Sequence, residues 1–355
     1  MSNITLLNES VRQAVGLVVN SSLSPEDIGP YLITLYASAY LFSILSPITV
    51  VSNGLLLVAI YKDPFKCFRT PVTFFNVSLA IVDLLAGTIV EPCFAIFYFA
   101  CYSKQTLDPG KYFSYLFHIA SFMSLVLISS SFLLVLALTT TQYIAITYPH
   151  KYKQLFTKKR VLIFVFGFFI YFAVFSSLQF TKIPTDIYLR INLHLHPTVI
   201  GFLLTIAHIL LFKSFRKFVQ QSKALRRPSM AQHLHPTAQG SKSEAKHQKQ
   251  LTVVALLLSA LLLLCSIPHI VTFYVYFYTK IISFTEIRNI SIALRVSDMI
   301  LFIKVALDAY IYAWRHPKYR KAVKGTILCY VKQTTRERDT EQELVATASS
   351  CKVQH

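Results

Sequence analysis

Seven long apolar stretches, separated by shorter polar segments, divide the chain. They cover residues 33–61, 71–99, 112–147, 161–181, 197–218, 251–278 and 287–314. Each is long enough to cross about 30 Å of hydrocarbon, which takes roughly 20 helical residues. The stretches are apolar all round, whereas a helix of a soluble domain has one apolar stripe. Runs such as 132–138 and 254–264 lack the alternation of a membrane β-barrel. The predicted fold class is therefore all-α, a seven-transmembrane helix bundle.

The basic residues indicate the direction of the crossings. Of the 35 Lys and Arg residues, 26 follow the first, third, fifth and seventh stretches, in groups of three, five, nine and nine. Basic loops stay in the cytoplasm, so the N-terminus is predicted outside and the C-terminus inside a multi-pass protein of the plasma membrane. The formal net charge of +19 then lies mostly on the cytoplasmic face. Its expected partner there is anionic membrane lipid and not nucleic acid.

This topology divides the chain into four segments. Residues 1–32 form an extracellular tail, 33–314 the helix bundle, 315–330 an amphipathic eighth helix on the membrane surface, and 331–355 a disordered cytoplasmic tail. Candidate glycosylation sites are Asn3, Asn8, Asn20 and Asn289, all on the predicted outer side. No cleavable signal is evident, so we expect the first span to act as the signal anchor.

The cytoplasmic end carries candidate modification sites. Cys329 closes the predicted eighth helix and is a candidate for palmitoylation. The Ser and Thr residues of the tail are candidates for phosphorylation by a receptor kinase, followed by arrestin binding. Cysteines contribute little else, because the second outer loop has none and cannot be tied down by a disulfide.

Local patterns in five of the stretches narrow the class of protein. They are Asn53-Gly54, Asp83, the segment from Gln142 to Pro149, Pro268, and the segment from Asp308 to Tyr312. In this order they resemble the rhodopsin-like (class A) G-protein-coupled receptors, over about residues 33–330. The segment 62–71 and the end of the seventh stretch resemble cnidarian members. The missing outer-loop cysteine and Asp308 distantly resemble melanocortin-type receptors.

The resemblance implies two partners, an extracellular ligand and a heterotrimeric G protein. It places the activation and G-protein interface at Thr141, Gln142, Tyr143, Pro149, Pro268 and Tyr312. Helix six is expected to swing about Pro268 and open a cytoplasmic cleft. Departures from the family pattern bear on this mechanism. Gln142 replaces the usual arginine, and Gln248 is not acidic, so the usual ionic lock is missing on both sides. Ser266 and Ala309 replace the usual tryptophan and proline.

Charged residues within the spans need partners, because an unpaired charge there costs at least a few kcal/mol. The family pattern brings Asp83, Ser131, Lys304 and Asp308 together in a sodium pocket. Lys304 brings its own cation, one helical turn from Asp308. We therefore predict that Lys304 pairs with Asp83 and Asp308 in the place of sodium. The alternative is an unpaired Lys304 in a polar crevice.

By family register, the ligand pocket opens to the outer half of the bundle. The candidate ligand-binding residues are Glu91, Ser121, Ser124, His269, Asp298 and Phe302. For Glu91 and Asp298 the alternative is a structural hydrogen bond, and for His269 a place in the packed core. Ser124 stands where amine receptors carry an aspartate, which leaves peptides, lipids or other small molecules as ligands.

The same register argues against a cofactor or metal. The retinal lysine of opsins falls on Phe302, and Lys304 points to another side of the helix. His194 and His196 have no third ligand nearby in the sequence, so no metal site is predicted.

Other functions remain as alternatives. No catalytic motif is present, so an enzyme is not expected. An ion channel or transporter would use Asp83, Lys304 and Asp308 as a charged path, although the chain shows no internal repeat. A third alternative is a receptor fold that no longer couples to G protein, because of Gln142.

Overall fold

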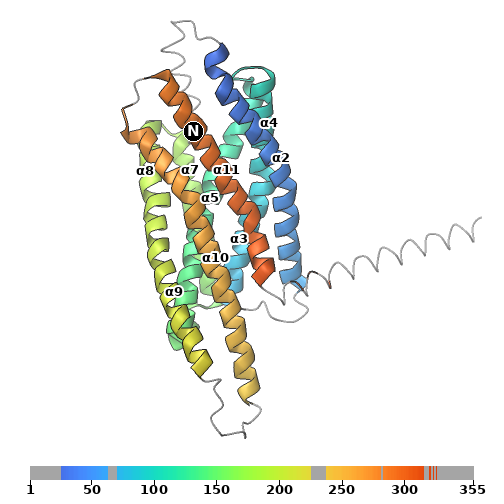
Figure 1. Ribbon diagram of the computed structural model, residues 1–355, viewed down its shortest axis with the longest axis vertical. Helices are drawn as coiled ribbons and strands as arrows, with labels where there is room; N and C mark the ends of the chain where they lie inside the picture. Colours follow the sequence, from blue (N-terminus) through green and yellow to red (C-terminus); the bar gives the residue numbers. More distant parts are fainter. Residues whose placement is uncertain are drawn as a thin grey trace, which may run out of the picture.

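The computed structural model describes residues 25–62, 70–224, 237–280 and 283–315, together with positions 320, 323 and 325. Every regular element in these ranges is helical (Figure 1). The spans, in chain order, are α2 (Pro25–Lys62), α3 (Pro71–Leu85) continued by η1 (Ala86–Val90) and α4 (Glu91–Ser103), α5 (Lys111–Thr147), α7 (Lys158–Ser177), α8 (Thr185–Leu193) continued by η3 (His194–Thr198) and α9 (Val199–Ala224), α10 (Thr237–Tyr278), and α11 (Phe284–Arg315). Two short elements flank α7 in the chain, α6 (Pro149–Leu155) before it and η2 (Leu178–Phe180) after it.

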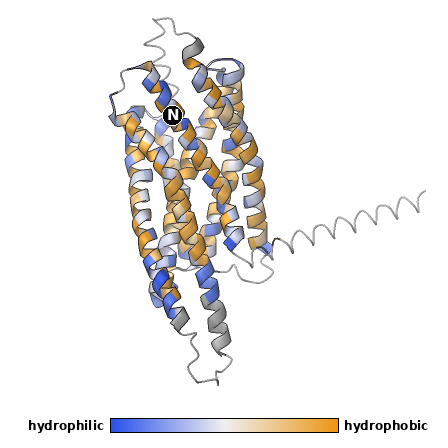
Figure 2. Cartoon of the chain, in the orientation of Figure 1, coloured by the Kyte–Doolittle hydropathy of each residue, from blue (hydrophilic) through white to orange (hydrophobic). Residues whose placement is uncertain are grey.

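The prediction of a seven-transmembrane helix bundle is confirmed. Six spans in the described ranges are long and apolar enough to cross a membrane by length and composition alone. The remaining crossing, α11, is not among these six because too many charged side chains lie along it, including Arg295, Asp298, Lys304 and Asp308. Figure 2 shows apolar residues along the middle of the helices and polar residues at the cytoplasmic ends of α9 and α10.

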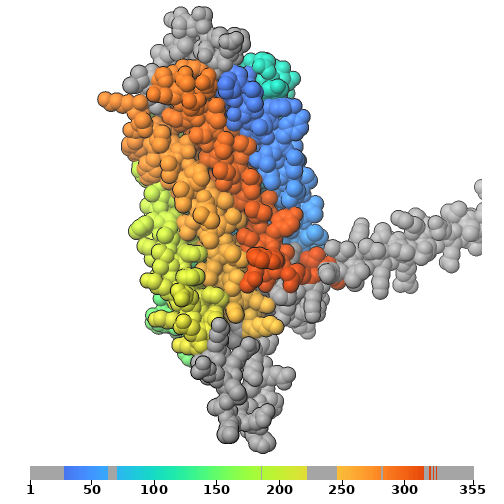
Figure 3. Space-filling model, in the orientation of Figure 1, coloured from blue at the N-terminus to red at the C-terminus, as the bar shows by residue number. Residues whose placement is uncertain are grey.

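The side chains divide between a packed interior and an apolar outer surface. Phe42, Phe94 and Leu134 are fully buried between the helices. Phe166 and Phe202 are more than 60% exposed, on faces that a soluble protein would have to cover. In a membrane-spanning bundle, lipid covers such faces. Figure 3 shows α2, α11, α10 and α9 following one another across one side of the bundle.

Local sequence explains where several helices begin. Pro71 starts α3 because proline at the first helical position has the right φ and loses no hydrogen bond there. Thr157 caps α7, its side-chain oxygen accepting a hydrogen bond from the backbone N–H of Arg160 at 3.4 Å. Pro149 starts α6, separated from the end of α5 by Tyr148 alone.

Three spans begin well before their predicted residues, and the first starts at Pro25 and not at residue 33. The fifth span starts at Thr185 and not at residue 197, because a π-helical turn accommodates Pro197 inside the helix. The sixth starts at Thr237 and not at 251, because Ala, Gln, Glu and Lys in this part of the predicted loop favour helix. Asn289 is exposed in the outer part of α11. Asn3, Asn8, Asn20 and Cys329, the tail 331–355, and most of the predicted eighth helix lie outside the described residues.

Candidate functional site

A small cavity of about 70 Å³ lies in the outer half of the bundle, between α5, the fifth span, α10 and α11. Ser121, Ser124, His269, Asp298 and Phe302, all predicted from the sequence, line it. Drug-sized ligands occupy pockets of roughly 300–1,000 Å³. The cavity therefore has to widen to hold a ligand of that size.

Glu91 is not among the residues that line this cavity, unlike the prediction. Its side chain is fully buried and accepts a hydrogen bond from Thr49 of α2 at 3.4 Å. The cause is the π-helical turn η1 immediately before it, which holds more residues than an α-turn and rotates the residues that follow. This hydrogen bond links the first two spans.

The polar groups of the cavity differ in how fully they are engaged. His196 places one ring nitrogen 2.7 Å from the Asn192 oxygen and the other 3.0 Å from the Tyr171 hydroxyl. The Ser121 hydroxyl is buried and has no hydrogen-bond partner among the described residues. An unsatisfied buried hydroxyl is costly, which makes Ser121 the clearest candidate for a polar contact with a ligand.

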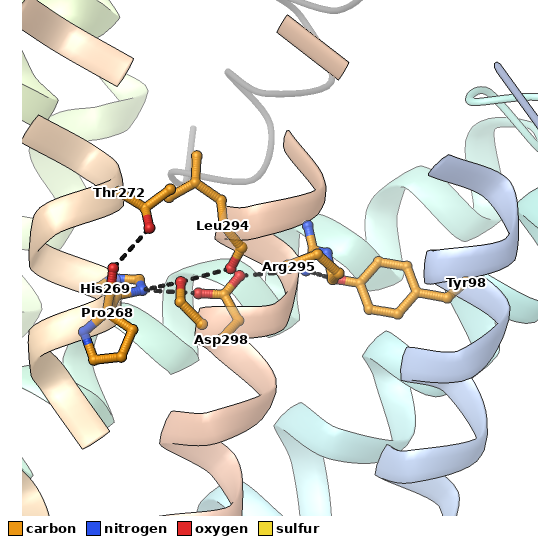
Figure 4. Close-up of polar contacts among 8 residues, drawn as sticks. Tyr98, Pro268, His269, Thr272, Leu294, Arg295 and Asp298 are labelled. Atoms are coloured by element: carbon orange, nitrogen blue, oxygen red, sulfur yellow. Dashed lines mark hydrogen bonds and ion pairs between the residues drawn. The ribbon is translucent and has the colours of Figure 1, made fainter. Parts of the chain in front are cut away.

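A row of polar side chains crosses the bundle beside the cavity (Figure 4). His269 Nδ1 lies 3.1 Å from one Asp298 oxygen, and Arg295 Nη1 lies 3.4 Å from the other. Arg295 also donates a hydrogen bond to the Tyr98 hydroxyl. The row thereby links α10, α11 and α4. Each carboxylate oxygen of Asp298 therefore faces a basic side chain of the protein.

Arg295 and Tyr98 were missed as site residues. A signal was present for Arg295, because an arginine within a membrane span marks a functional site by default. Its side chain is 2% exposed. Tyr98 gave no such signal, since an aromatic residue in an apolar helix is ordinary.

A second polar cluster lies deeper in the bundle. Lys304 Nζ is 2.6 Å from Asp308 Oδ2 and donates a hydrogen bond to Ser131 Oγ at 2.8 Å. Asp83 forms no ion pair with Lys304 within 4 Å and lies instead with Asp308 on a small cavity of about 10 Å³. The predicted direct pairing with Asp83 is therefore wrong, because Lys304 reaches the carboxylate one turn along its own helix. The Lys304 ammonium thus lies beside Asp308, in the region where the family pattern predicted a sodium pocket.

The cytoplasmic ends of α5 and α10 are joined by neutral side chains. The amide nitrogen of Gln248 donates to the side-chain oxygen of Gln142 at 2.9 Å, and the Thr252 hydroxyl lies 3.3 Å from the same oxygen. Gln142 is fully buried. We call Gln142, Gln248 and Thr252 the amide lock. These residues stand where the family has its ionic lock. From the sequence, only the absence of that ionic lock could be predicted.

The other predicted interface residues lie at different levels of the bundle. Thr141 is buried beside Gln142, Tyr143 is partly buried and stacks edge-on with Tyr148, and Pro149 begins α6. Pro268 lies inside α10, where its carbonyl accepts a hydrogen bond from Thr272 at 2.7 Å. Tyr312 is buried on the small cavity with Asp83 and Asp308.

The family model of the 7 transmembrane receptor (rhodopsin family) matches residues 52–312, well over half of the chain. The chain belongs to the rhodopsin family of G-protein-coupled receptors. This is a family of multi-pass membrane receptors and not of enzymes. The crystal structure of squid rhodopsin matches this receptor with a TM-score of 0.65 at 16% identity, covering 84% of this chain and 87% of that chain. At that identity the likeness shows the fold alone. No curated protein matches the receptor.

The geometry also bears on retinal. Phe302 lines the outer cavity, while Lys304 points into the deeper cluster with Asp308 and Ser131. A Schiff-base lysine would have to face the cavity. The residues present therefore do not fit a retinal site.

Proposed function

We propose that this receptor acts at the plasma membrane, binds an extracellular ligand in the outer cavity, and signals through a heterotrimeric G protein. One observation supports the proposal: α10 contributes residues both beside the outer cavity and to the amide lock at the cytoplasmic end. His269 joins the row of polar side chains beside the outer cavity, and Gln248 and Thr252 belong to the amide lock at the cytoplasmic end. A movement of α10 would change both.

Pro268 supplies the bending point. It immediately precedes His269, and a proline inside a helix removes one backbone hydrogen bond and favours a kink. A ligand that widens the outer cavity pushes on His269 and rotates the cytoplasmic part of α10. The amide lock then breaks and a cleft opens for the G protein. The ligand acts by binding the open state more tightly than the closed one.

The charges indicate the class of ligand. Both oxygens of Asp298 already face protein groups, and Ser124 provides no charge. A protonated amine would lose its water shell without gaining a free carboxylate. We therefore favour a peptide, a lipid or an uncharged small molecule, with its polar group at Ser121.

Replacing Gln248 with leucine is expected to raise basal G-protein activation about fivefold. The change removes one interhelical hydrogen bond, worth about 1 kcal/mol, from the closed state. Nucleotide exchange on purified G proteins of every class, driven by receptor in nanodiscs, measures the effect without a ligand. Gln221→Leu is the matched control, because Gln221 is exposed near the end of α9. Equal rates for wild type, Gln248→Leu and the control would contradict the proposed lock.

Gln142→Arg tests coupling itself. The arginine meets no acidic partner at position 248, so we expect it both to break the amide lock and to provide the charge that the family uses at the G-protein interface. Higher exchange than in wild type supports this mechanism. If wild type, Gln248→Leu and Gln142→Arg all fail to activate any G protein, the chain is a receptor fold that does not couple.

Lys304→Asn is expected to create sensitivity to sodium, because it vacates the place beside Asp308 that the ammonium fills. Wild type should unfold at the same temperature in sodium chloride and in choline chloride. The variant should gain about 1.4 kcal/mol from sodium present at ten times its Kd. Thermal unfolding of the purified receptor measures both. A wild type stabilised by sodium would show that Lys304 does not replace the ion.

A further inference from the structure

A second cavity, which the proposed function does not use, lies in the cytoplasmic third of the bundle. It is an open cavity bordered by α3, α5, α6 and α7, with a volume of about 460 Å³. That volume lies within the range of ligand pockets, whereas the outer cavity lies far below it. Its walls are mainly apolar, with rings contributed by Phe75, Phe156 and Phe164.

The cavity has exposed apolar residues at its rim. Leu155 is 51% exposed and Phe164 is 47% exposed. Leu162, Ile163 and Phe166 of α7 are exposed as well, on a helix that spans the membrane. An apolar rim on such a helix faces hydrocarbon and not water. A ligand of this cavity would therefore enter from the inner leaflet of the bilayer.

The charge at this site has one sign. Arg160 is the single charged residue among those that line the cavity. Lys158 and Lys159 precede it in the first turn of α7 and are exposed. The sequence contains no Asp or Glu between Asp108 and Asp186, so this region has no acidic residue of its own. Arg160 Nη1 donates to the Gln154 carbonyl at 2.7 Å, which leaves other guanidinium N–H groups for a ligand.

A polar atom inside the cavity also lacks a partner. Thr141 is 1% exposed and lines the cavity, and its hydroxyl has no hydrogen-bond partner among the described residues. A buried hydroxyl without a partner costs free energy that an acceptor on a ligand would remove. The site thus combines apolar walls, one buried donor and a basic mouth.

We propose that this cavity binds an acidic phospholipid of the inner leaflet. One acyl chain lies against the aromatic walls, an ester carbonyl accepts a hydrogen bond from Thr141, and the anionic headgroup lies at Arg160, Lys158 and Lys159. The cytoplasmic leaflet is the one that carries anionic lipid, which matches the orientation of the basic residues. Thr141 directly precedes Gln142 of the amide lock. A lipid bound to Thr141 therefore lies next to that lock.

Lipid retention by the purified full-length receptor tests this. Receptor equilibrated with vesicles of phosphatidylcholine and phosphatidylserine is analysed by native mass spectrometry for bound lipid. Wild type should retain phosphatidylserine in preference to phosphatidylcholine. Arg160→Gln should lower that preference about fivefold, the effect of one basic residue at the membrane surface. Arg216→Gln, which changes an exposed basic residue at the cytoplasmic end of α9, should leave it unchanged.

A second variant tests the cavity and not only the charge. Ala137 lines the wall on α5, and Ala137→Phe should displace the acyl chain and remove the retained lipid while thermal unfolding shows the receptor still folded. Equal retention of the two lipids by wild type overturns the proposal. So does an equal loss in Arg216→Gln and Arg160→Gln, which would indicate general surface charge, or preferential retention of oleate when that free fatty acid is added. If Ala137→Phe unfolds, Ala137→Val serves in its place, and undiminished lipid retention in that variant counts against the cavity.

Discussion

Replacing Lys304 with methionine is expected to destabilise the receptor by about 3–5 kcal/mol, and to lower its unfolding temperature by on the order of 10 °C. The side chains of Lys304 and Asp308 are each 2% exposed, and Lys304 Nζ lies 2.6 Å from Asp308 Oδ2. Methionine has a similar length but no charge, so the variant leaves Asp308 buried without its cation, beside Asp83. Thermal unfolding of the purified receptor in detergent measures the loss.

A double variant separates pairing from the loss of either side chain. Lys304→Met combined with Asp308→Leu removes both charges together, and apolar replacements of a buried pair are often neutral. We expect the double variant to recover most of the stability that either single variant loses. Additive losses would contradict a paired cluster, because independent sites add and interacting sites do not. Ser131→Ala, which removes only the hydrogen bond at 2.8 Å, should cost much less than Lys304→Met.

The features that could be predicted from the sequence are those determined within one segment of the chain. The seven crossings follow from the hydropathy of each segment alone. Even α11 was identified, although Arg295, Asp298, Lys304 and Asp308 interrupt its apolar part. Lys304 and Asp308 are one turn apart on one helix, so their contact follows from helical geometry. Both results needed no knowledge of how helices are rotated against each other.

The contacts that the sequence did not show depend on helix rotation. One π-helical turn between Asp83 and Glu91 turns Glu91 away from the expected pocket, and no residue in that segment identifies such a turn. The amide lock joins residues more than a hundred positions apart. The sequence showed that Gln142 and Gln248 are uncharged. Their hydrogen bond depends on the relative register of α5 and α10, which residue types alone do not specify.

Replacing Arg295 with methionine should destabilise the receptor by about 2–3 kcal/mol, the cost of leaving a charged hydrogen-bonding partner unsatisfied. Arg295 is almost fully buried and engages both Asp298 and Tyr98. Without Arg295, the Asp298 carboxylate has only His269 as a partner among the described residues. The Asp298 side chain is 14% exposed, so water compensates little for the loss. Thermal unfolding measures the change. Arg190→Met is the control, because Arg190 forms an exposed ion pair with Asp186, and such pairs contribute less than about 1 kcal/mol.

Variants of the two partners of Arg295 distinguish between its possible roles. If its main role is to neutralise Asp298, then Asp298→Asn in the Arg295→Met background restores most of the stability, while Tyr98→Phe alone costs only about 1 kcal/mol for one hydrogen bond. If Tyr98→Phe costs as much as Arg295→Met, the arginine instead holds α4 to α11, and the neutralised carboxylate is incidental. In the first case Arg295→Met also frees a carboxylate on the outer cavity. That variant should then bind small organic amines that wild type rejects, measured as a rise in unfolding temperature with added amine. Equal binding by wild type would contradict the view that Arg295 keeps Asp298 from cationic ligands.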